Sequence, residues 1–105
     1  MSAFTEIATV QNGDFYYHYK RNPQGEWNNY LYQVLNIGHH TEISDFDESA
    51  LVIYRPLYKS SFGTHWACRP FQMFAGYVEL DGKRTKRFTL VTDEILLEKC
   101  RAATR

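Results

Sequence analysis

The chain has 105 residues, enough for one hydrophobic core and too few for two independent ones. It carries 12 basic and 12 acidic residues, so it lacks the overall positive excess of many nucleic-acid-binding domains. Aromatic residues make up 16% of the chain, which excludes a disordered segment. The first residues lack the features of a signal peptide, and no stretch reaches the roughly 18 apolar residues of a membrane span. We therefore expect one folded domain over residues 1–105, in the cytoplasm and without membrane contact.

The zero net charge conceals an uneven distribution of charge along the chain. Residues 1–50 carry two basic and seven acidic side chains, residues 51–82 carry three and two, and residues 83–105 carry seven and three. The favoured interpretation is that the two ends fold beside each other and pair their charges. A basic surface on residues 83–87 is the alternative, but four cations are a modest footprint, so a nucleic acid is a less favoured partner.

The first half of the chain predicts two strands and a loop. Residues 14–20 form an aromatic strand after a turn at Asn12-Gly13, and residues 22–29 form a polar loop. Residues 30–37 alternate as a second strand, with Tyr32 and Val34 on the face opposite Leu31. Residues 38–49 lack apolar periodicity and hold most of the acidic charge, which indicates a surface loop.

The second half predicts a third strand at 51–58, a turn at 60–63 and a fourth strand at 65–69. Pro70 opens a single helical turn that brings Phe71 and Phe74 to one face. Asp81-Gly82 predicts a type I′ turn that pairs residues 78–80 with a strand ending at 88–90. A helix over residues 92–104 follows, capped by Thr92; its apolar stripe is Leu96, Cys100 and Ala103.

These elements predict a mainly β fold. Five or six short strands, a single-turn helix and a C-terminal α-helix fit a small, strongly bent antiparallel barrel or roll better than a sandwich, which needs more strands. Cys68 and Cys100 have no metal-ligand spacing and suit free, packed thiols in a reducing compartment. We expect no disulfide, no metal and no cofactor.

No residue is assigned a catalytic role. His40 and Glu42 could form a proton-transfer pair, but residues two apart in a loop rarely meet. The four histidines have no recognised metal-ligand spacing. Cys68 beside Arg69 could be a reactive thiol, although an alternating strand would equally turn it inward as a small apolar residue.

Arginine and aromatic residues concentrate in two of the predicted strands. Arg55 and Arg69 lie inside otherwise apolar segments and need hydrogen-bond acceptors there, for which Glu42 is the natural partner. The arrangement is either a structural salt bridge or a pocket for an anionic or planar group, and the two are compatible. Trp27, in the first long loop, is either a hydrophobic lid or a binding anchor.

Several short motifs, in order and spacing, resemble the bacterial domain of unknown function 1653 family over residues 15–90. They are H-Y-K at 18–20, Y-x-V at 32–34, H-T-E at 40–42, V-I-Y-R-P-L-Y at 52–58, W-A-C-R-P at 66–70, M-F at 73–74, D-G at 81–82 and R-F at 87–88. The resemblance implies an SH3-like small barrel in cytoplasmic bacterial proteins, without an established activity. The family's polar signature falls on His18, His40, Glu42, Tyr54, Arg55, Trp66 and Arg69.

The preferred function is a non-catalytic binding or interaction module, with an arginine and aromatic pocket near the loop over residues 39–49. Its partner is an unidentified ligand, a protein or a small anion. The alternative is a small enzyme acting on an anionic metabolite, with His40 and Glu42 for proton transfer and Arg55 and Arg69 as the anion clamp. A third, purely structural hypothesis expects both arginines to support stability and no binding.

Overall fold

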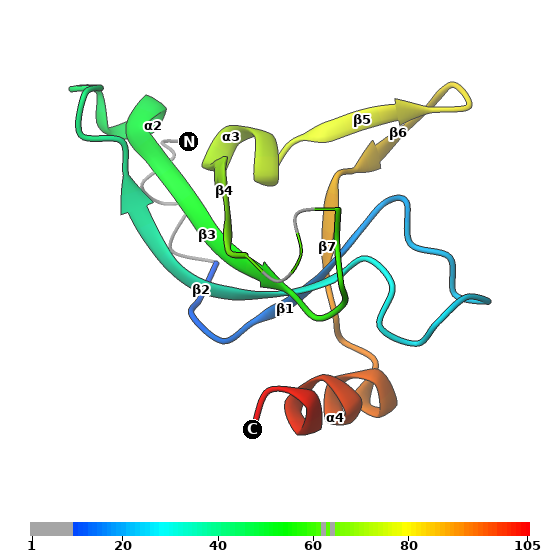
Figure 1. Ribbon diagram of the computed structural model, residues 1–105. Coiled ribbons are helices and arrows are strands. Elements are labelled where there is room, and N and C mark those ends of the chain that lie inside the picture. The colour runs from blue at the N-terminus through cyan, green and yellow to red at the C-terminus, as the bar shows by residue number, and fades with distance from the viewer. Residues whose placement is uncertain (1–9, 62, 64) are drawn as a thin grey trace.

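The computed structural model describes residues 10–61, 63 and 65–105 (Figure 1). A five-stranded antiparallel sheet has the order β4-β3-β2-β1-β7, so the last strand lies beside the first. Its strands are β1 (Phe15–His18), β2 (Leu31–His39), β3 (Ala50–Pro56), β4 (Ala67–Pro70) and β7 (Phe88–Leu90). The hairpin of β5 (Tyr77–Leu80) and β6 (Lys83–Lys86) is a separate sheet, and the helices are α2 (Phe46–Ser49), α3 (Phe71–Phe74) and α4 (Glu94–Ala103).

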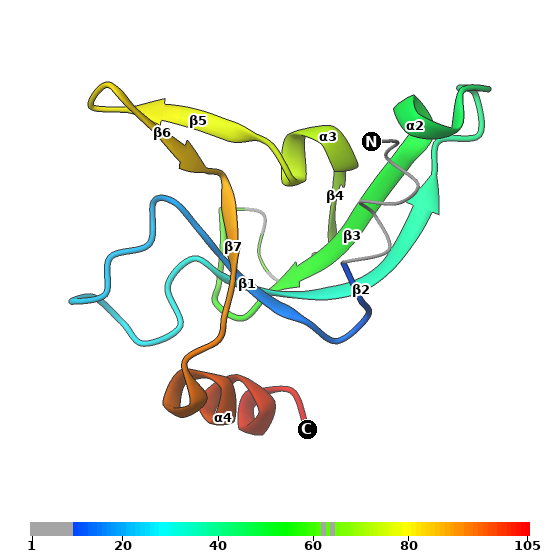
Figure 2. The ribbon, with the colours of Figure 1, turned by 180° about the vertical axis from the view of Figure 1, so that it is seen from behind.

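The predicted mainly β fold is confirmed, with seven strands in the described residues rather than the predicted five or six. The larger sheet does not close into a barrel, because its edge strands β4 and β7 are not hydrogen-bonded to each other. Strands β5 and β6 pair with one another and project from the body instead of bridging that gap (Figure 2). The result is a strongly bent open sheet, with a register shift in β2 between Val34 and Asn36.

The two faces of the sheet bury separate clusters because successive strand residues point to opposite faces. On the α3 face, Tyr16, Val34 and Tyr54 pack with Phe71 and Phe74 of α3. The α4 face buries a second cluster that contacts Leu96 and Leu97 of α4; its members are Phe15, Leu31, Val91 and Cys100. Helices α3 and α4 lie on opposite sides of the sheet (Figure 1).

The turn at Asp81-Gly82 is confirmed, but its predicted strand pairing is wrong. Both residues have positive φ, 52° and 76°, as a type I′ turn requires. A two-residue turn places Leu80 opposite Lys83, so β5 pairs with residues 83–86. The pairing ends at Tyr77 and Lys86 and does not reach Phe88. Residues 88–90 form their own strand, which pairs with β1 instead.

The helical predictions are confirmed with shifted details. Pro70 precedes α3, where Phe71 and Phe74 are both 2% exposed. Helix α4 is capped by Asp93 rather than Thr92, since the Asp93 carboxylate accepts the Leu96 N–H at 2.9 Å. Of the predicted apolar stripe, Leu96 and Cys100 pack against the sheet, but Ala103 is exposed. Leu97, which was not predicted, packs against the sheet as well.

Residues 38–49 are not a continuous loop. Strand β2 runs on to His39, and the short helix α2 occupies residues 46–49 because Asp45 accepts the Glu48 N–H at 3.0 Å. The turn at 60–63 is confirmed by two backbone hydrogen bonds between Ser60 and Gly63. Expectations for residues 1–9, including the absence of a signal peptide, lie outside the described residues.

Candidate functional site

Aromatic rings and two arginines gather on the α3 face around Phe88. The Phe88 ring centroid lies 5.1 Å from that of His18 and 5.7 Å from those of Tyr32 and Tyr54. The Tyr30 ring stacks on the His18 ring, with centroids 5.6 Å apart, and its centroid lies 5.7 Å from that of Tyr58. We call this set the arginine–aromatic cluster; its members are His18, Tyr30, Tyr32, Tyr54, Tyr58, Arg69, Arg87 and Phe88.

Strand register explains why residues distant in sequence meet here. His18 is opposite Phe88 in the β1–β7 pair, and Tyr54 is opposite Val34 in the β2–β3 pair. Arg69 is opposite Val52 in the β3–β4 pair. Residues directly opposite each other on paired strands share a face, so five strands each contribute to one surface.

Arg69 lies over an aromatic ring and lacks a negative partner. Its guanidinium carbon is 5.4 Å from the Phe88 ring centroid, within cation–π range. Its Nε–H donates to the hydroxyl of Tyr54 at 3.2 Å. Within the part of the chain that the structure describes, no carboxylate lies within 4.0 Å of this guanidinium. Its positive charge is therefore uncompensated.

Arg87 adds a second guanidinium to the same cluster. Its Nε atom is buried and has no hydrogen-bond partner among the described residues. A buried N–H without an acceptor is costly, by roughly 1–3 kcal/mol. No ion pair to Arg87 occurs in residues 10–61, 63 and 65–105 either. The cluster therefore holds two arginines whose donors exceed the described acceptors.

His18 is neutral at physiological pH. Burial is the main reason that its pKa is lowered to about 4, and the positive charges of Arg69, Lys20 and Arg87 lower it further. Its Nδ1 accepts the backbone N–H of Lys20 at 3.2 Å, which requires an unprotonated Nδ1. The proton of the neutral ring is therefore on Nε2, so His18 also presents an N–H donor.

The tyrosines are neutral donors rather than bases. The hydroxyls of Tyr32 and Tyr58 share a hydrogen bond. Burial raises the pKa of both phenols, that of Tyr32 most strongly. A general base works best with a pKa near the operating pH, and neither His18 nor these tyrosines meet that condition. Neither His18 nor these tyrosines is therefore suited to act as a general base at neutral pH.

Three of the seven sequence-predicted site residues meet in this cluster, namely His18, Tyr54 and Arg69. Arg55 lies on the α4 face, where its Nε and Nη2 donate to Oε1 of Gln33 at 2.9 and 2.7 Å. The expected partner Glu42 is not used, because the register of β2 and β3 places Gln33 directly opposite Arg55.

The remaining predicted site residues lie elsewhere. His40 and Glu42 are exposed beyond the end of β2, where His40 Nδ1 accepts the Glu42 backbone N–H at 3.2 Å. Tyr30, the ring that stacks on His18, precedes the start of β2. Strand β2 has nine residues and is therefore about 26 Å long, at about 3.3 Å per residue. His18, beside Tyr30, and His40, beyond the last residue of β2, thus lie at opposite ends of this strand. Trp66 is 68% exposed just before β4.

The other five members of the cluster were not among the predicted site residues; they are Tyr30, Tyr32, Tyr58, Arg87 and Phe88. The predicted alternation of the second strand already placed Tyr32 with Val34 on one face, but it could not say which face holds the site. Arg87 could have been found from the sequence, because it directly precedes a predicted strand. A cation at such a position needs a hydrogen-bond acceptor, by the same argument as for Arg55 and Arg69.

Metal ligands, membrane-spanning helices and cysteines are other possible functional features. Among the described residues, no group of three or more His, Cys, Asp or Glu side chains could hold a metal ion, and no helix is long and apolar enough to cross a membrane. Both cysteines are free thiols. The prediction of packed thiols is confirmed for Cys100 and wrong for Cys68, which is exposed on the edge strand β4.

The fold and the site thus define a small, mainly β domain with an arginine–aromatic cluster on one face of an open sheet. Residues 14–90, from the residue before β1 to the end of β7, match the family described as "Protein of unknown function (DUF1653)". The chain belongs to this family; α4 lies outside the matched region. No curated protein and no solved structure matches the chain.

Proposed function

We propose that the protein is a non-catalytic binding module whose arginine–aromatic cluster takes a ligand with an anionic group and a planar group. One observation carries this proposal: Arg69 and Arg87 lie close enough to neutral His18 for their charges to lower its pKa, and no carboxylate pairs with them in the described part of the chain. Arginine forks bind carboxylates and phosphates, and tyrosine faces receive planar groups. A bound anion would supply the acceptors and the negative charge that the cluster lacks.

The enzyme hypothesis receives less support. It requires His40 and Glu42 to share a site with Arg55 and Arg69. The loop with His40 lies at one end of β2, Arg55 is on the α4 face, and Arg69 is on the α3 face. No described contact brings the proton-transfer pair to either arginine.

Thermal unfolding with small probes tests the binding proposal. Guanosine and adenosine monophosphate combine an anion with a planar base, while inorganic phosphate and adenosine supply each half alone. We expect a nucleotide to raise the Tm of the wild-type protein by several degrees and to do so more than either half. Arg69→Gln and Arg87→Gln should lose the shift, whereas the matched control Arg55→Gln, on the other face, should keep it.

The same measurement separates binding from a purely structural role. If both Arg55→Ala and Arg69→Ala lower the Tm and no probe shifts the Tm of the wild-type protein, the arginines serve stability alone. A Tm shift that survives in Arg69→Gln and Arg87→Gln would place the ligand outside the cluster.

We also propose, as the family resemblance implies, an SH3-like fold in a cytoplasmic bacterial protein. The return of β7 to the side of β1 supports the fold, and two free thiols suit a reducing compartment. Thiol labelling during denaturing lysis of cells, which exposes the buried Cys100, should find both cysteines reduced.

A further inference from the structure

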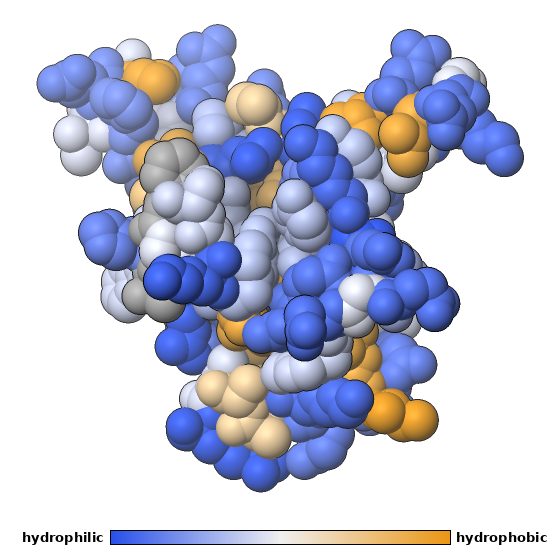
Figure 3. All heavy atoms as spheres, turned by 45° about the vertical axis from the view of Figure 1, so that its right-hand side comes forward, coloured by the Kyte–Doolittle hydropathy of each residue, from blue (hydrophilic) through white to orange (hydrophobic). Residues whose placement is uncertain are grey.

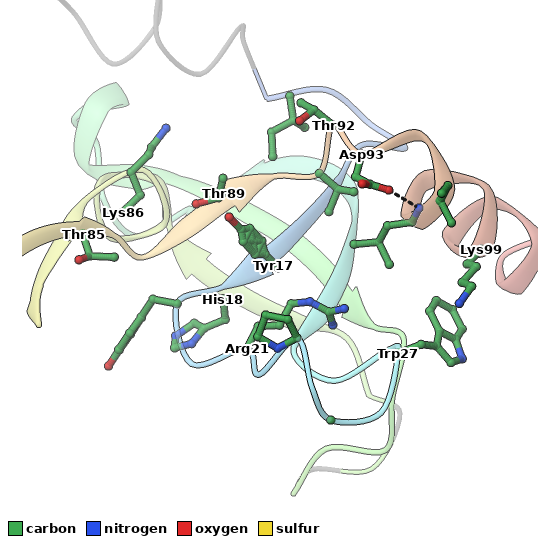
Figure 4. Close-up of a pocket in the computed structure, with 17 residues that line it drawn as sticks. Tyr17, His18, Arg21, Trp27, Thr85, Lys86, Thr89, Thr92, Asp93 and Lys99 are labelled. Carbon is green, nitrogen blue, oxygen red and sulfur yellow. Dashed lines mark hydrogen bonds between the residues drawn. The ribbon is translucent and has the colours of Figure 1, made fainter.

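A groove of about 760 Å³ lies beside the start of α4 (Figure 4), and it meets the arginine–aromatic cluster at one residue, His18, which lines it as well. Tyr17 of β1 and Thr89 of β7 lie at its centre. The loop after β1 forms one wall, and the start of α4 forms the other. We call it the Trp27 groove; the lining residues used below are Tyr17, Arg21, Trp27, Lys86, Asp93 and Lys99.

The charge in the groove is positive and unpaired. Within the described residues, no carboxylate lies within 4.0 Å of the cationic groups of Arg21, Lys86 or Lys99. The ion pairs of the described residues join Glu98 to Arg101 and to Arg105. The one carboxylate in the lining, Asp93, accepts the Leu96 N–H and caps α4. Its negative charge is offset by the helix N-terminus. Three cations therefore face the groove without a local counter-charge.

The positive surface continues from the groove onto the hairpin. Lys86 lies at the end of β6, and the same strand carries Lys83 and Arg84. The Arg84 guanidinium stacks over the Tyr77 ring at 3.9 Å. The expected pairing of the basic last quarter with the acidic first half is not found among the described residues. These cations remain available to a polyanion.

Aromatic side chains provide flat surfaces inside the groove. Tyr17 and Trp27 pack partly against the α4-face cluster, so their rings are held in place rather than free in solution. Both also line the groove with part of their surface. The two interpretations of Trp27, lid and anchor, are therefore compatible in this structure. Fixed rings beside unpaired cations are the combination that single-stranded nucleic acids use, with bases on rings and phosphates on cations.

We infer that the Trp27 groove binds single-stranded nucleic acid. Its bases stack on Tyr17 and Trp27, and its phosphates contact Arg21, Lys86 and Lys99. A duplex offers the same phosphates but keeps its bases stacked inside, so the rings contribute little to binding it. The surface seen in Figure 3 is largely hydrophilic, with smaller apolar patches, and the groove lining includes the exposed apolar residues Leu90 and Ile95. This site shares His18 with the anion site but uses different cations, since Arg69 and Arg87 do not line the groove.

Fluorescence anisotropy with a fluorescein-labelled 15-nucleotide oligouridylate tests the charge contribution. Each phosphate contact to a single strand contributes about 0.7 to the slope of log K against log salt, so three contacts predict a slope of about −2. Lys99→Gln should weaken binding by roughly five- to tenfold at low salt and reduce this slope by about 0.7. Lys59→Gln is the matched control, since Lys59 is exposed and does not line the groove.

Tryptophan fluorescence tests the stacking contribution. The chain has two tryptophans, so Trp66→Phe leaves Trp27 as the reporter and Trp27→Phe leaves Trp66. The oligouridylate should quench the Trp27 signal and leave the Trp66 signal nearly unchanged. Trp27→Leu, which keeps an apolar side chain for packing, should weaken binding by at least about fivefold. Its unfolding curve checks that the variant is folded.

The inference is overturned by any of four results. The first is no binding of the oligouridylate at 25 mM salt with protein in the 100 μM range, and the second is equally tight binding of a 15-base-pair duplex. The third is that an excess of polyglutamate, a competing polyanion, leaves oligouridylate binding unchanged. The fourth is that Lys99→Gln and Lys59→Gln weaken binding equally. Arg69→Gln should bind the oligonucleotide like the wild-type protein. That variant therefore separates failure of this inference from failure of the anion site.

Discussion

The two faces of the five-stranded sheet treat their arginines differently. On the α4 face, both Nε and Nη2 of Arg55 donate to one Gln33 oxygen. On the α3 face, Arg69 has a single longer hydrogen bond to a tyrosine hydroxyl, and the Nε of Arg87 has none among the described residues. Arg55 thus has a side-chain acceptor for two of its N–H groups, whereas Arg69 has one weaker acceptor and the buried Nε of Arg87 has none among the described residues.

This difference separates arginines that belong to the scaffold from arginines that are candidates for ligand contact. Where internal partners satisfy a buried polar group, the group is part of the scaffold. Where they do not, an external acceptor lowers the free energy of the bound state, and the residues become candidates for ligand contact. The proposed anion site rests on this contrast, and four measurements can break or sharpen it.

The largest expected effect is loss of the aromatic core on the α3 face. Phe74 is 2% exposed and its ring stacks on Phe88 at 4.4 Å. We expect Phe74→Ala to lower the free energy of unfolding by about 3–5 kcal/mol, because the cavity cannot be refilled by the short helix α3. Urea denaturation measures it. Met73→Ala, one residue earlier and 47% exposed, should change stability by less than about 0.5 kcal/mol.

The second effect is a pH dependence from His18, which is 8% exposed. Its pKa in the folded state, about 4, is below the 6.5 of an unfolded histidine, so between these values the unfolded chain binds the extra proton. The free energy of unfolding should therefore fall as pH is lowered from 6.5 toward 4, by at most about 3 kcal/mol from this residue. Urea denaturation across that range should show a shallower pH dependence in His18→Gln. Parallel curves for the two proteins would contradict the buried neutral histidine.

The third effect concerns Cys100, fully buried on the α4 face. Burial raises the pKa of its thiol, and Cys68 is exposed, so a disulfide reagent should label Cys68 rapidly and Cys100 only after unfolding. Cys100→Ser places a hydroxyl in the apolar cluster and should cost about 1–3 kcal/mol. Cys68→Ser is the matched control and should be nearly neutral. Rapid labelling of both thiols in the native state would show that α4 does not cover its face of the sheet.

The smallest effect compares the two arginines directly. A double-mutant cycle of Gln33→Ala and Arg55→Ala should give a coupling of about 1 kcal/mol, because two hydrogen bonds join the side chains. A cycle of Tyr54→Phe and Arg69→Ala should give about half of that, from one hydrogen bond of 3.2 Å. A larger coupling for Tyr54 and Arg69 would mean that the α3 face is as well satisfied as the α4 face.

Local sequence patterns predicted most elements because their causes are local. The β turn at Asp81-Gly82 follows from backbone conformations that few residue pairs tolerate, and the single turn after Pro70 follows from two phenylalanines spaced for one face. The helix α2 was missed because four residues have no detectable periodicity. The separate strand at residues 88–90 was assigned the wrong partner, since strand pairing joins residues far apart in the chain.

The sequence by itself determined the fold class, the main turns, the C-terminal helix and three residues of the site. Only the tertiary structure decided which arginine faces which partner. Alternation along a strand fixes that neighbouring residues point to opposite faces, but not which face is which or which strand lies alongside. The pairing of β2 with β3 gave Arg55 to Gln33, and the return of β7 to β1 brought Phe88 and Arg87 to His18. Cross-strand register, a non-local property, therefore decided which arginine of the sheet found a side-chain acceptor.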